Sequence, residues 1–367
     1  MTTLLTDEQL LLRDSARELL AARHPIAWVR EWTRSEPARR AEMHAALWKQ
    51  FAEMGWLGLL LPEAQGGMAL GFVEQTIVLE ELGRGLVPSA YLSTLLGTTL
   101  LARSDDEVLA REACPRVAAG DLVLAVALAE PHGDDPRTFA ARWSEDGGVT
   151  GSKAFVADVP VAHQIVVAAR DAHDDLVWVL VDRDAKGITV ASPATMDETR
   201  PLHRVSFDAT PARRIGPFAR LWAHTEPIHW LALAAEAVGG CSVVLESAVA
   251  YAKERVQFGA PIGVNQAIKH KCSDMLVRTE GARAITYHAA RELGRHPDEG
   301  AFACSMAKAH ATEAYREVAA EGIQIHGGVG FTWEFDCHLF FKRARANEIT
   351  AGHPDEHRER IARGAGL

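Results

Sequence analysis

The sequence predicts an α+β protein with a helical region, a β-rich region and a second helical region. Apolar residues recur at the helical period before about residue 115 and again after about residue 219. Between them lie short runs rich in β-branched residues, separated by turn formers. We therefore expect an N-terminal α-helical domain over 1–115, a central antiparallel β-barrel or sandwich over 116–218, and a helical bundle over 219–367.

The N-terminal region begins with a capping-box pattern, in which Thr6 is the N-cap and Gln9 follows three residues later. An apolar stripe then continues as one helix. Further helices are expected wherever the helical period resumes between glycine- or proline-containing loops. They cover about 40–54, 71–82 and 89–103.

The central region contains at least five short strands. They are expected at Leu122–Ala129, Gly148–Val156, His163–Ala169, Leu176–Val181 and Gly187–Val190. Their regular spacing favours a small antiparallel barrel or sandwich of about 100 residues. The dipeptides Gly147-Gly148 and Lys186-Gly187 are interpreted as hairpin corners.

The C-terminal region predicts long helices. They cover about 226–254, 266–293, 298–325 and 337–346. His353 and His357 stand four residues apart, which could indicate a metal pair, but Pro354 lies between them and a third ligand is missing. We interpret this segment as a solvated helix start and expect no metal site.

Composition excludes several classes of function. The 367 residues carry 39 basic and 49 acidic side chains, a formal net charge of −10, and the basic residues are scattered. Nucleic-acid binding is not expected, because it needs a concentrated positive field. The sequence shows no uninterrupted apolar run of about 18 residues, no signal-peptide pattern and no Cys-x-x-Cys pair. We therefore expect a soluble cytoplasmic protein that does not enter a membrane.

Two motifs indicate an anion-binding site. Arg255-Val-Gln-Phe-Gly-Ala-Pro-Ile-Gly lies between two expected helices, so a guanidinium, exposed N–H groups and a helix start could bind a phosphate together. Gln324 lies one turn before Gly327 and Gly328, which places a polar group beside bare backbone. The alternatives are a plain helix–loop–helix corner for the first motif and a helix C-cap for the second.

Five motifs in order resemble the acyl-CoA dehydrogenase family of flavoproteins, and the resemblance covers essentially the whole chain. The motifs are Leu61-Pro-Glu-Ala-Gln-Gly-Gly, Leu128-Ala-Glu-Pro, Gly151-Ser-Lys-Ala-Phe, Arg255-Val-Gln-Phe-Gly with Asn265-Gln-Ala-Ile, and Gln324-Ile-His-Gly-Gly-Val-Gly-Phe. The resemblance implies a β-barrel between an N-terminal helical domain and a C-terminal four-helix bundle. It also implies FAD, α,β-dehydrogenation of an acyl-CoA thioester, electron-transfer flavoprotein as the acceptor, and oligomerisation through the C-terminal helices.

The resemblance further implies roles for single residues. In this family one chain holds the flavin ring and a catalytic base, while its neighbour binds the pyrophosphate and adenosine end of FAD. The residues matching the neighbour's contribution are Arg255, Gln257, Phe258, Gln266, Gln324, Gly327 and Gly328. Ala351 stands where most relatives carry the glutamate base, and alanine cannot accept a proton. A minority of relatives carry the base on the preceding long helix, where this chain has His229, with Glu226 one turn earlier.

The ring side of the site also departs from the family pattern. Ala129 replaces the usual Thr before Glu-Pro, and Phe155-Val-Ala157 replaces Trp-x-Thr, so two hydroxyl donors are absent. This selective loss is similar to the base-less subunits of heterotetrameric (α2β2) actinobacterial enzymes that act on CoA thioesters of steroid side chains. We therefore expect a subunit for lipid or steroid catabolism with a paralogous partner. The alternatives are a self-sufficient homo-oligomer with a relocated base and a non-catalytic family member.

Overall fold

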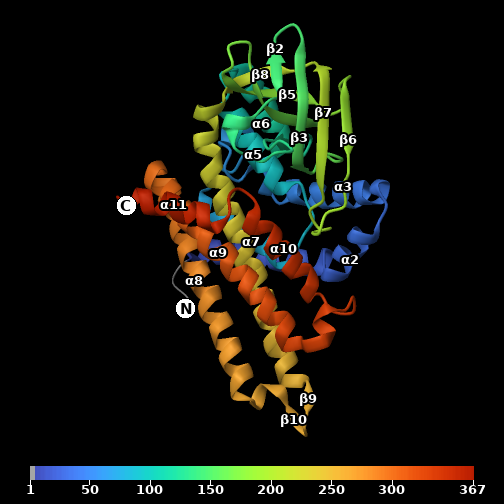
Figure 1. The fold of residues 1–367 in the computed structure, drawn as a ribbon, viewed down its shortest axis with the longest axis vertical. Helices are drawn as coiled ribbons and strands as arrows, with labels where there is room; N and C mark the ends of the chain where they lie inside the picture. The colour runs from blue at the N-terminus through green and yellow to red at the C-terminus, as the bar shows by residue number, and fades with distance from the viewer. Residues whose placement is uncertain (1–4) are drawn as a thin grey trace. The chain divides into compact units, whose positions relative to one another are not determined.

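The computed structural model of the protein describes residues 5–367 (Figure 1). The helices are α1 (Asp7–Arg23), α2 (Ile26–Arg34), α3 (Pro37–Glu53), α4 (Phe72–Arg84), α5 (Tyr91–Ala102), α6 (Glu107–Ala118), α7 (Phe218–Glu254), α8 (Gln266–Arg295), α9 (Pro297–His326), α10 (Cys337–Ile349) and α11 (Pro354–Gly364). The strands are β1 (Leu124–Ala127), β2 (Arg142–Ser144), β3 (Gly148–Ala157), β4 (Gln164–Arg170), β5 (Leu176–Asp182), β6 (Ile188–Ala191), β7 (Leu202–Thr210), β8 (Arg213–Pro217), β9 (Val256–Gln257) and β10 (Ala260–Pro261). This order of helices, sheet and helices confirms the predicted fold class.

By compactness the chain divides into two units, and the three expected domains remain a prediction. Unit 1 contains the residues up to Glu31 together with Gly71–Val87 and Trp230–Leu367. Unit 2 contains Trp32–Leu70 and Pro88–His229.

The N-terminal helices confirm the expected capping box. The Thr6 hydroxyl accepts a hydrogen bond from the Gln9 N–H at 3.3 Å, and the Gln9 side chain accepts one from the Thr6 N–H at 3.0 Å. Helices α2 and α6 were not expected. Helix α2 has only nine residues, and α6 contains Pro115 in its interior. A short length and an internal proline each weaken the prediction of a helix from sequence.

The sheet of unit 2 is mixed rather than wholly antiparallel. Its strand order is β6-β7-β3-β2-β4-β5-β8, with β1 paired to β4. Strands β1 and β2 run parallel to β4, and the other pairs are antiparallel. The hairpin predicted at Gly148 joins β2 to β3. The hairpin predicted at Gly187 is wrong, because β5 pairs with β4 and β8 whereas β6 pairs with β7.

Both faces of this sheet are buried, as the alternation along β4 shows. Val166 and Ala168 belong to one apolar core, and Ile165 and Val167 belong to another. The first core includes residues of α5, α6 and the start of α7, and the Trp178 ring stacks there on Phe218 at 5.1 Å between centroids. Strands buried on both faces appear in sequence as continuous apolar runs, which is why β4 and β5 were predictable.

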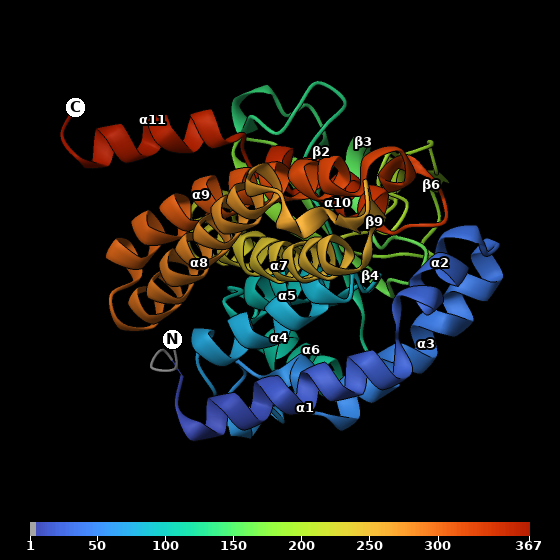
Figure 2. The same cartoon turned by 90° about the horizontal axis from the view of Figure 1, so that it is seen from below.

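Unit 1 is built from helices, of which α7, α8, α9 and α10 lie together (Figure 2). Helix α7 is the one helix among the described residues that is long and apolar enough to cross a membrane, but 83% of its most apolar window is buried. Burial of this kind is typical of the core helix of a soluble protein. Glycines allow α4 to approach α7 closely, since a Cβ at Gly239 would lie 2.0 Å from the Glu80 carbonyl oxygen.

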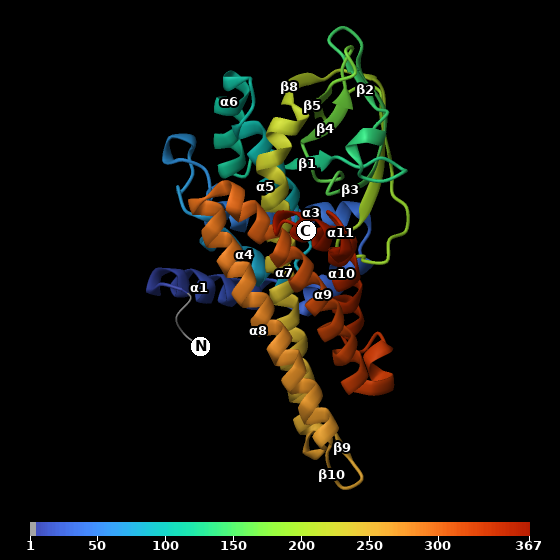
Figure 3. The same cartoon turned by 60° about the vertical axis from the view of Figure 1, so that its left-hand side comes forward.

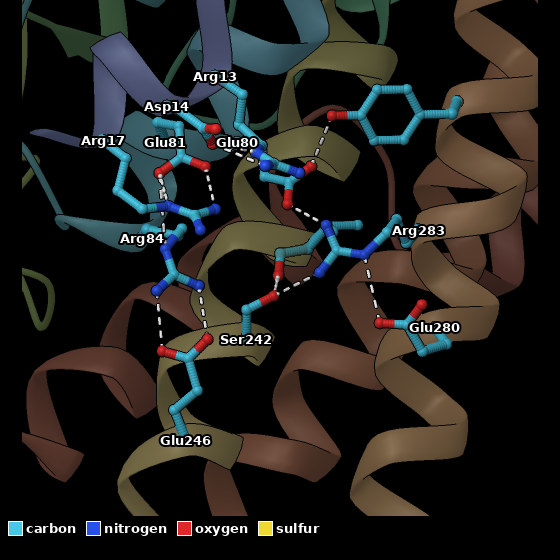
Figure 4. A network of polar contacts seen from close by, with 12 residues as sticks. Arg13, Asp14, Arg17, Glu80, Glu81, Arg84, Ser242, Glu246, Glu280 and Arg283 are labelled. Atoms are coloured by element: carbon cyan, nitrogen blue, oxygen red, sulfur yellow. Dashed lines mark hydrogen bonds and ion pairs between the residues drawn. The ribbon is translucent and has the colours of Figure 1, made fainter. Parts of the chain in front are cut away.

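A network of charged groups joins α4 to its neighbours in unit 1 (Figure 4). Glu80 and Glu81 are adjacent and both are buried. Glu81 pairs with Arg17 of α1 at 2.6 Å. Glu80 pairs with Arg283 of α8 and accepts a hydrogen bond from the Tyr287 hydroxyl at 2.8 Å. Burial and the Glu80 charge raise the pKa of Tyr287, so this phenol stays protonated and continues to donate.

Candidate functional site

The Arg255 motif forms a short hairpin at the C-terminal end of α7 (Figure 3). Strands β9 and β10 pair antiparallel, and the Arg255 carbonyl accepts a hydrogen bond from Ile262 N–H at 2.8 Å. Phe258 and Gly259 form the turn, with φ of +51° and +83°. The Arg255 guanidinium is exposed and makes no ion pair or side-chain hydrogen bond with residues 5–367. The chain therefore presents a cation that is available to a ligand.

The start of α8 follows the hairpin directly. Asn265 is the N-cap of α8 but makes no side-chain capping hydrogen bond, and Gln266 is exposed at the first position. Gly263 lies against α7, since a Cβ there would lie 2.9 Å from the Ala252 carbonyl oxygen. The hairpin is thus held close to the helix that it follows, with a helix N-terminus beside it.

The second predicted motif lies at the C-terminal end of α9. Gln324 is exposed, and Gly327 adopts φ +66° as the helix ends. A Cβ built on Gly327 or on Gly328 would meet nothing within 4 Å. The backbone at both glycines is therefore uncovered, as a site for a closely approaching ligand requires.

Aromatic contacts bring the two motifs together. Tyr251, one turn before Arg255, stacks on the His326 ring at 4.4 Å between centroids. Phe335 packs edge-on against Tyr251 at 6.0 Å and against His326 at 5.6 Å. The His326 Nδ1 also lies 2.7 Å from the Gly322 carbonyl oxygen. The last turns of α7 and α9, which directly precede Arg255 and the two glycines, are thus packed side by side.

The segment around Ala351 contains no free carboxylate in place of the base. Ala351 adopts φ +58°, and its carbonyl oxygen lies 3.0 Å from His357 Nε2. The buried Lys308 ammonium donates to the Glu348 and Gly352 carbonyl oxygens. Glu348 lies three residues earlier, but its carboxylate accepts hydrogen bonds from Arg316 and Arg345. These contacts fix the backbone of the segment and leave a methyl group at position 351.

His357 corrects the expected solvated helix start. His353 is the N-cap of α11, as that interpretation requires, but His357 is fully buried. Its Nδ1 lies 2.8 Å from the Ser305 hydroxyl, and its ring packs edge-on against Trp230 at 5.1 Å. Burial and the nearby Lys308 charge lower the pKa of His357 to about 4. The helix start is therefore tethered to α9 by a neutral imidazole.

The weaker base candidates lie in unit 2, whereas Ala351 lies in unit 1. Glu226 and His229 are both half-buried on α7, one turn apart and on either side of the buried Pro227. Their proposed catalytic role stays a prediction.

Two of the family motifs meet through a buried ion pair in unit 2. Glu130 of Leu128-Ala-Glu-Pro accepts hydrogen bonds from the Ala140 and Ala141 N–H groups at 2.8 and 3.0 Å. Lys153 of Gly151-Ser-Lys-Ala-Phe donates to Glu130 at 2.9 Å. Phe155, two residues further along β3, adopts φ +57° at a bulge, with 62% of its surface exposed. The ion pair fixes the Glu130 loop to strand β3, two segments that the resemblance places beside the flavin ring.

Sequence reasoning missed the residues that assemble these sites. Tyr251 and His326 were not singled out, although one lies four residues before Arg255 and the other directly precedes Gly327. The Glu130–Lys153 pair was also missed, since neither residue is unusual in its own motif. Only the fold shows that these side chains meet.

Comparison with known proteins agrees with this arrangement. Family models for the N-terminal and C-terminal domains of acyl-CoA dehydrogenase match residues 6–121 and 230–366. The chain is 34% identical to acyl-CoA dehydrogenase IpdE2 of Mycolicibacterium smegmatis, over 94% of this chain and 97% of the relative.

Two solved structures give a TM-score of 0.87. One is a variant of the Tcur3481-Tcur3483 steroid ACAD, at 29% identity over 98% of this chain and 99% of that chain. The other is the ChsE4-ChsE5 complex from Mycobacterium tuberculosis, at 26% identity over 99% of this chain and 98% of that chain. On the strength of the sequence matches, this chain belongs to the acyl-CoA dehydrogenase family of flavoproteins, oxidoreductases that act on CH–CH bonds.

Proposed function

We propose that this chain is a subunit of a hetero-oligomeric acyl-CoA dehydrogenase. In this proposal it supplies the pyrophosphate and adenosine half of an FAD site to a paralogous subunit that carries the catalytic glutamate. One contrast carries the proposal: Arg255 is exposed and unpaired among residues 5–367, whereas position 351 offers only a methyl group. The chain thus retains a binding surface and lacks a base at position 351.

The residues present suit the phosphate-bearing part of FAD. Arg255 would pair with the pyrophosphate, because guanidinium donors match phosphate oxygens. Gln266 and Gln324 offer exposed amides, and the uncovered backbone at Gly327 and Gly328 allows close approach. Gln257 and Phe258 complete the proposed set at the hairpin. Bound FAD supplies the hydride acceptor for α,β-dehydrogenation, and the role of these residues is to bind and orient it.

The substrate and the partners follow from the relatives. One neighbour is named a steroid ACAD and another a complex of two different proteins. We therefore propose a bulky polycyclic acyl-CoA as substrate, an α2β2 assembly with a glutamate-bearing paralogue, and electron-transfer flavoprotein as acceptor. The exposed apolar side chains Val256, Phe258 and Val264 near the hairpin suit burial against a second subunit.

The test is flavin occupancy of the complex purified with its paralogue. Arg255→Ala should weaken FAD binding by about 10- to 100-fold, since hydrogen bonds to charged groups contribute about 1.5–3 kcal/mol. Lys253→Ala is the matched control, because Lys253 is also exposed and lies two residues earlier. The readout is visible flavin absorbance per protein. Equal occupancy in the wild type and in Arg255→Ala would contradict the proposal.

The same preparation distinguishes the alternatives. A purified wild-type chain that is yellow and active by itself would favour the homo-oligomer, and Glu226→Gln would then identify a relocated base by abolishing turnover. A chain that acquires no flavin beside any paralogue would favour the non-catalytic member. The hetero-oligomer proposal expects a chain that is colourless alone and a complex that is yellow.

A further inference from the structure

His326 is held in one orientation between the two motifs of the proposed half-site. The residue is 5% exposed, with Tyr251 stacked on one face of its ring and Phe335 packed edge-on. Its Nδ1 lies 2.7 Å from the Gly322 carbonyl oxygen. A carbonyl oxygen only accepts hydrogen bonds, so this contact assigns the ring proton to Nδ1.

The assignment leaves Nε2 as an acceptor. In the neutral imidazole one nitrogen donates and the other accepts, so Nε2 presents a lone pair. No residue among 5–367 donates a hydrogen bond to Nε2. This atom is nevertheless not fully shielded from solvent. A mostly buried ring therefore keeps one oriented acceptor that a ligand can reach.

The neighbouring backbone indicates what such a ligand would be. His326 directly precedes Gly327 and Gly328, where an added Cβ would meet nothing within 4 Å. Phosphate oxygens would be repelled by a lone pair, since they are acceptors themselves. The hydroxyl groups of a ribose and the amino group of adenine are donors, so the acceptor suits the nucleoside part of a dinucleotide.

We propose that His326 is a further cofactor-binding residue, whose Nε2 accepts a hydrogen bond from the ribose or the adenine of FAD. This inference rests on the proposed half-site and deepens it. Arg255 neutralises the pyrophosphate, and His326 recognises a neutral donor of the adjoining adenosine. Tyr251 and Phe335 act as positioning residues, because they hold the imidazole ring that carries the acceptor.

The experiment separates the acceptor from the stacked ring. His326→Phe keeps an aromatic ring against Tyr251 and removes Nε2, while His326→Gln replaces the ring by an amide with an acceptor oxygen. His288→Phe, at an exposed position of α8, is the matched control. FAD is titrated into the apo form of the complex with the paralogue, and thermal unfolding of each apo variant is recorded.

We expect His326→Phe to bind FAD about tenfold more weakly than the wild type, which corresponds to one lost hydrogen bond. Its unfolding temperature should fall only slightly, because the Nδ1 hydrogen bond to Gly322 is lost as well while the aromatic stack is kept. His326→Gln should recover part of the affinity, and His288→Phe should behave as the wild type. Competition with ADP and inosine diphosphate then identifies the donor. Equal loss of affinity for both competitors assigns the ribose, and a loss for ADP alone assigns the adenine amino group.

Full FAD affinity in His326→Phe would overturn the inference, as would a loss of affinity that His326→Gln shares in full. The Arg255→Ala variant keeps the two proposals distinguishable. If Arg255→Ala depletes FAD and His326→Phe does not, only the role of His326 fails. If neither variant affects FAD, the half-site itself fails.

Discussion

Replacing Lys153 by methionine tests the buried ion pair that joins two of the family motifs. The Lys153 side chain is fully buried, and its ammonium donates to Glu130 at 2.9 Å and to the Leu128 carbonyl oxygen at 3.0 Å. It also lies 4.1 Å from the centre of the Phe139 ring. Lys153→Met keeps most of the volume and removes the charge, so the Glu130 carboxylate stays buried without its cation.

The expected loss of stability follows from what remains around Glu130. Breaking a buried ion pair by removing one partner costs about 3–5 kcal/mol. Glu130 keeps the Ala140 and Ala141 N–H donors, so we expect about 3 kcal/mol, at the lower end. The double variant Glu130→Gln with Lys153→Met removes both charges and should recover part of this loss, because the glutamine oxygen can still accept from one of the two N–H groups while its NH2 group faces the other.

The pH dependence gives an independent check. Burial lowers the pKa of Lys153 to about 8, against the opposing effect of Glu130. The folded pKa therefore lies below the unfolded value of 10.5, and the unfolded chain binds more protons between the two. The stability of the wild type should then rise between pH 8 and 10.5 through this group, by about 3 kcal/mol at most. This rise does not conflict with the loss in Lys153→Met, because a neutral lysine amine still donates to Glu130 and Leu128 and a methionine cannot. Lys153→Met should lack that rise.

Urea unfolding followed by tryptophan fluorescence measures both effects, because Trp143 and Trp178 lie in the same sheet. The urea midpoint at neutral pH gives the loss of stability in Lys153→Met. A series of buffers up to pH 10.5 gives the dependence of stability on alkaline pH. If Lys153→Met unfolds at the same urea concentration as the wild type, the expected cost of the unpaired carboxylate is refuted. A double variant that is no more stable than Lys153→Met would refute it as well.

Two further predictions concern the base position and the α4–α7 contact. Ala351→Glu should leave the isolated chain without acyl-CoA turnover, because Ala129 and Ala157 still cannot donate to a flavin ring. The same substitution should barely change the turnover of the complex with the paralogue. Turnover gained by the isolated variant would contradict this prediction. Gly239→Ala should destabilise the fold by about 3 kcal/mol, since its Cβ would lie 2.0 Å from the Glu80 carbonyl oxygen and 2.7 Å from Arg84 N. Gly259→Ala is the matched comparison, because there only the positive φ opposes a side chain, and we expect a loss of stability of about 1 kcal/mol. Thermal unfolding measures the loss in both variants.

Sequence predicted the elements whose signals are local. The Thr6 capping box, the long helices and the doubly buried strands depend on neighbours in the chain, and each was found. The pairing of β6 with β7 and the burial of His357 depend on residues far apart, and both were mispredicted. The residues of the half-site were singled out by resemblance, and their roles stay a prediction. The contact between Tyr251 and His326 had no signal, because an aromatic residue near a helix end is ordinary.

The charge network around α4 has a consequence for synthesis of the chain. Arg17 and Glu81 are 64 residues apart, and Glu80 and Arg283 are 203 residues apart. Unit 1 therefore cannot be completed until the ribosome has made α8, and Glu80 has no cation from that helix while the intervening sheet is translated. A fragment of residues 230–367 lacks Glu80, so the face of α8 that carries Arg283 would be exposed. We expect such a fragment to aggregate or to need a chaperone. Expression of this protein in pieces should fail even where the pieces match family domains.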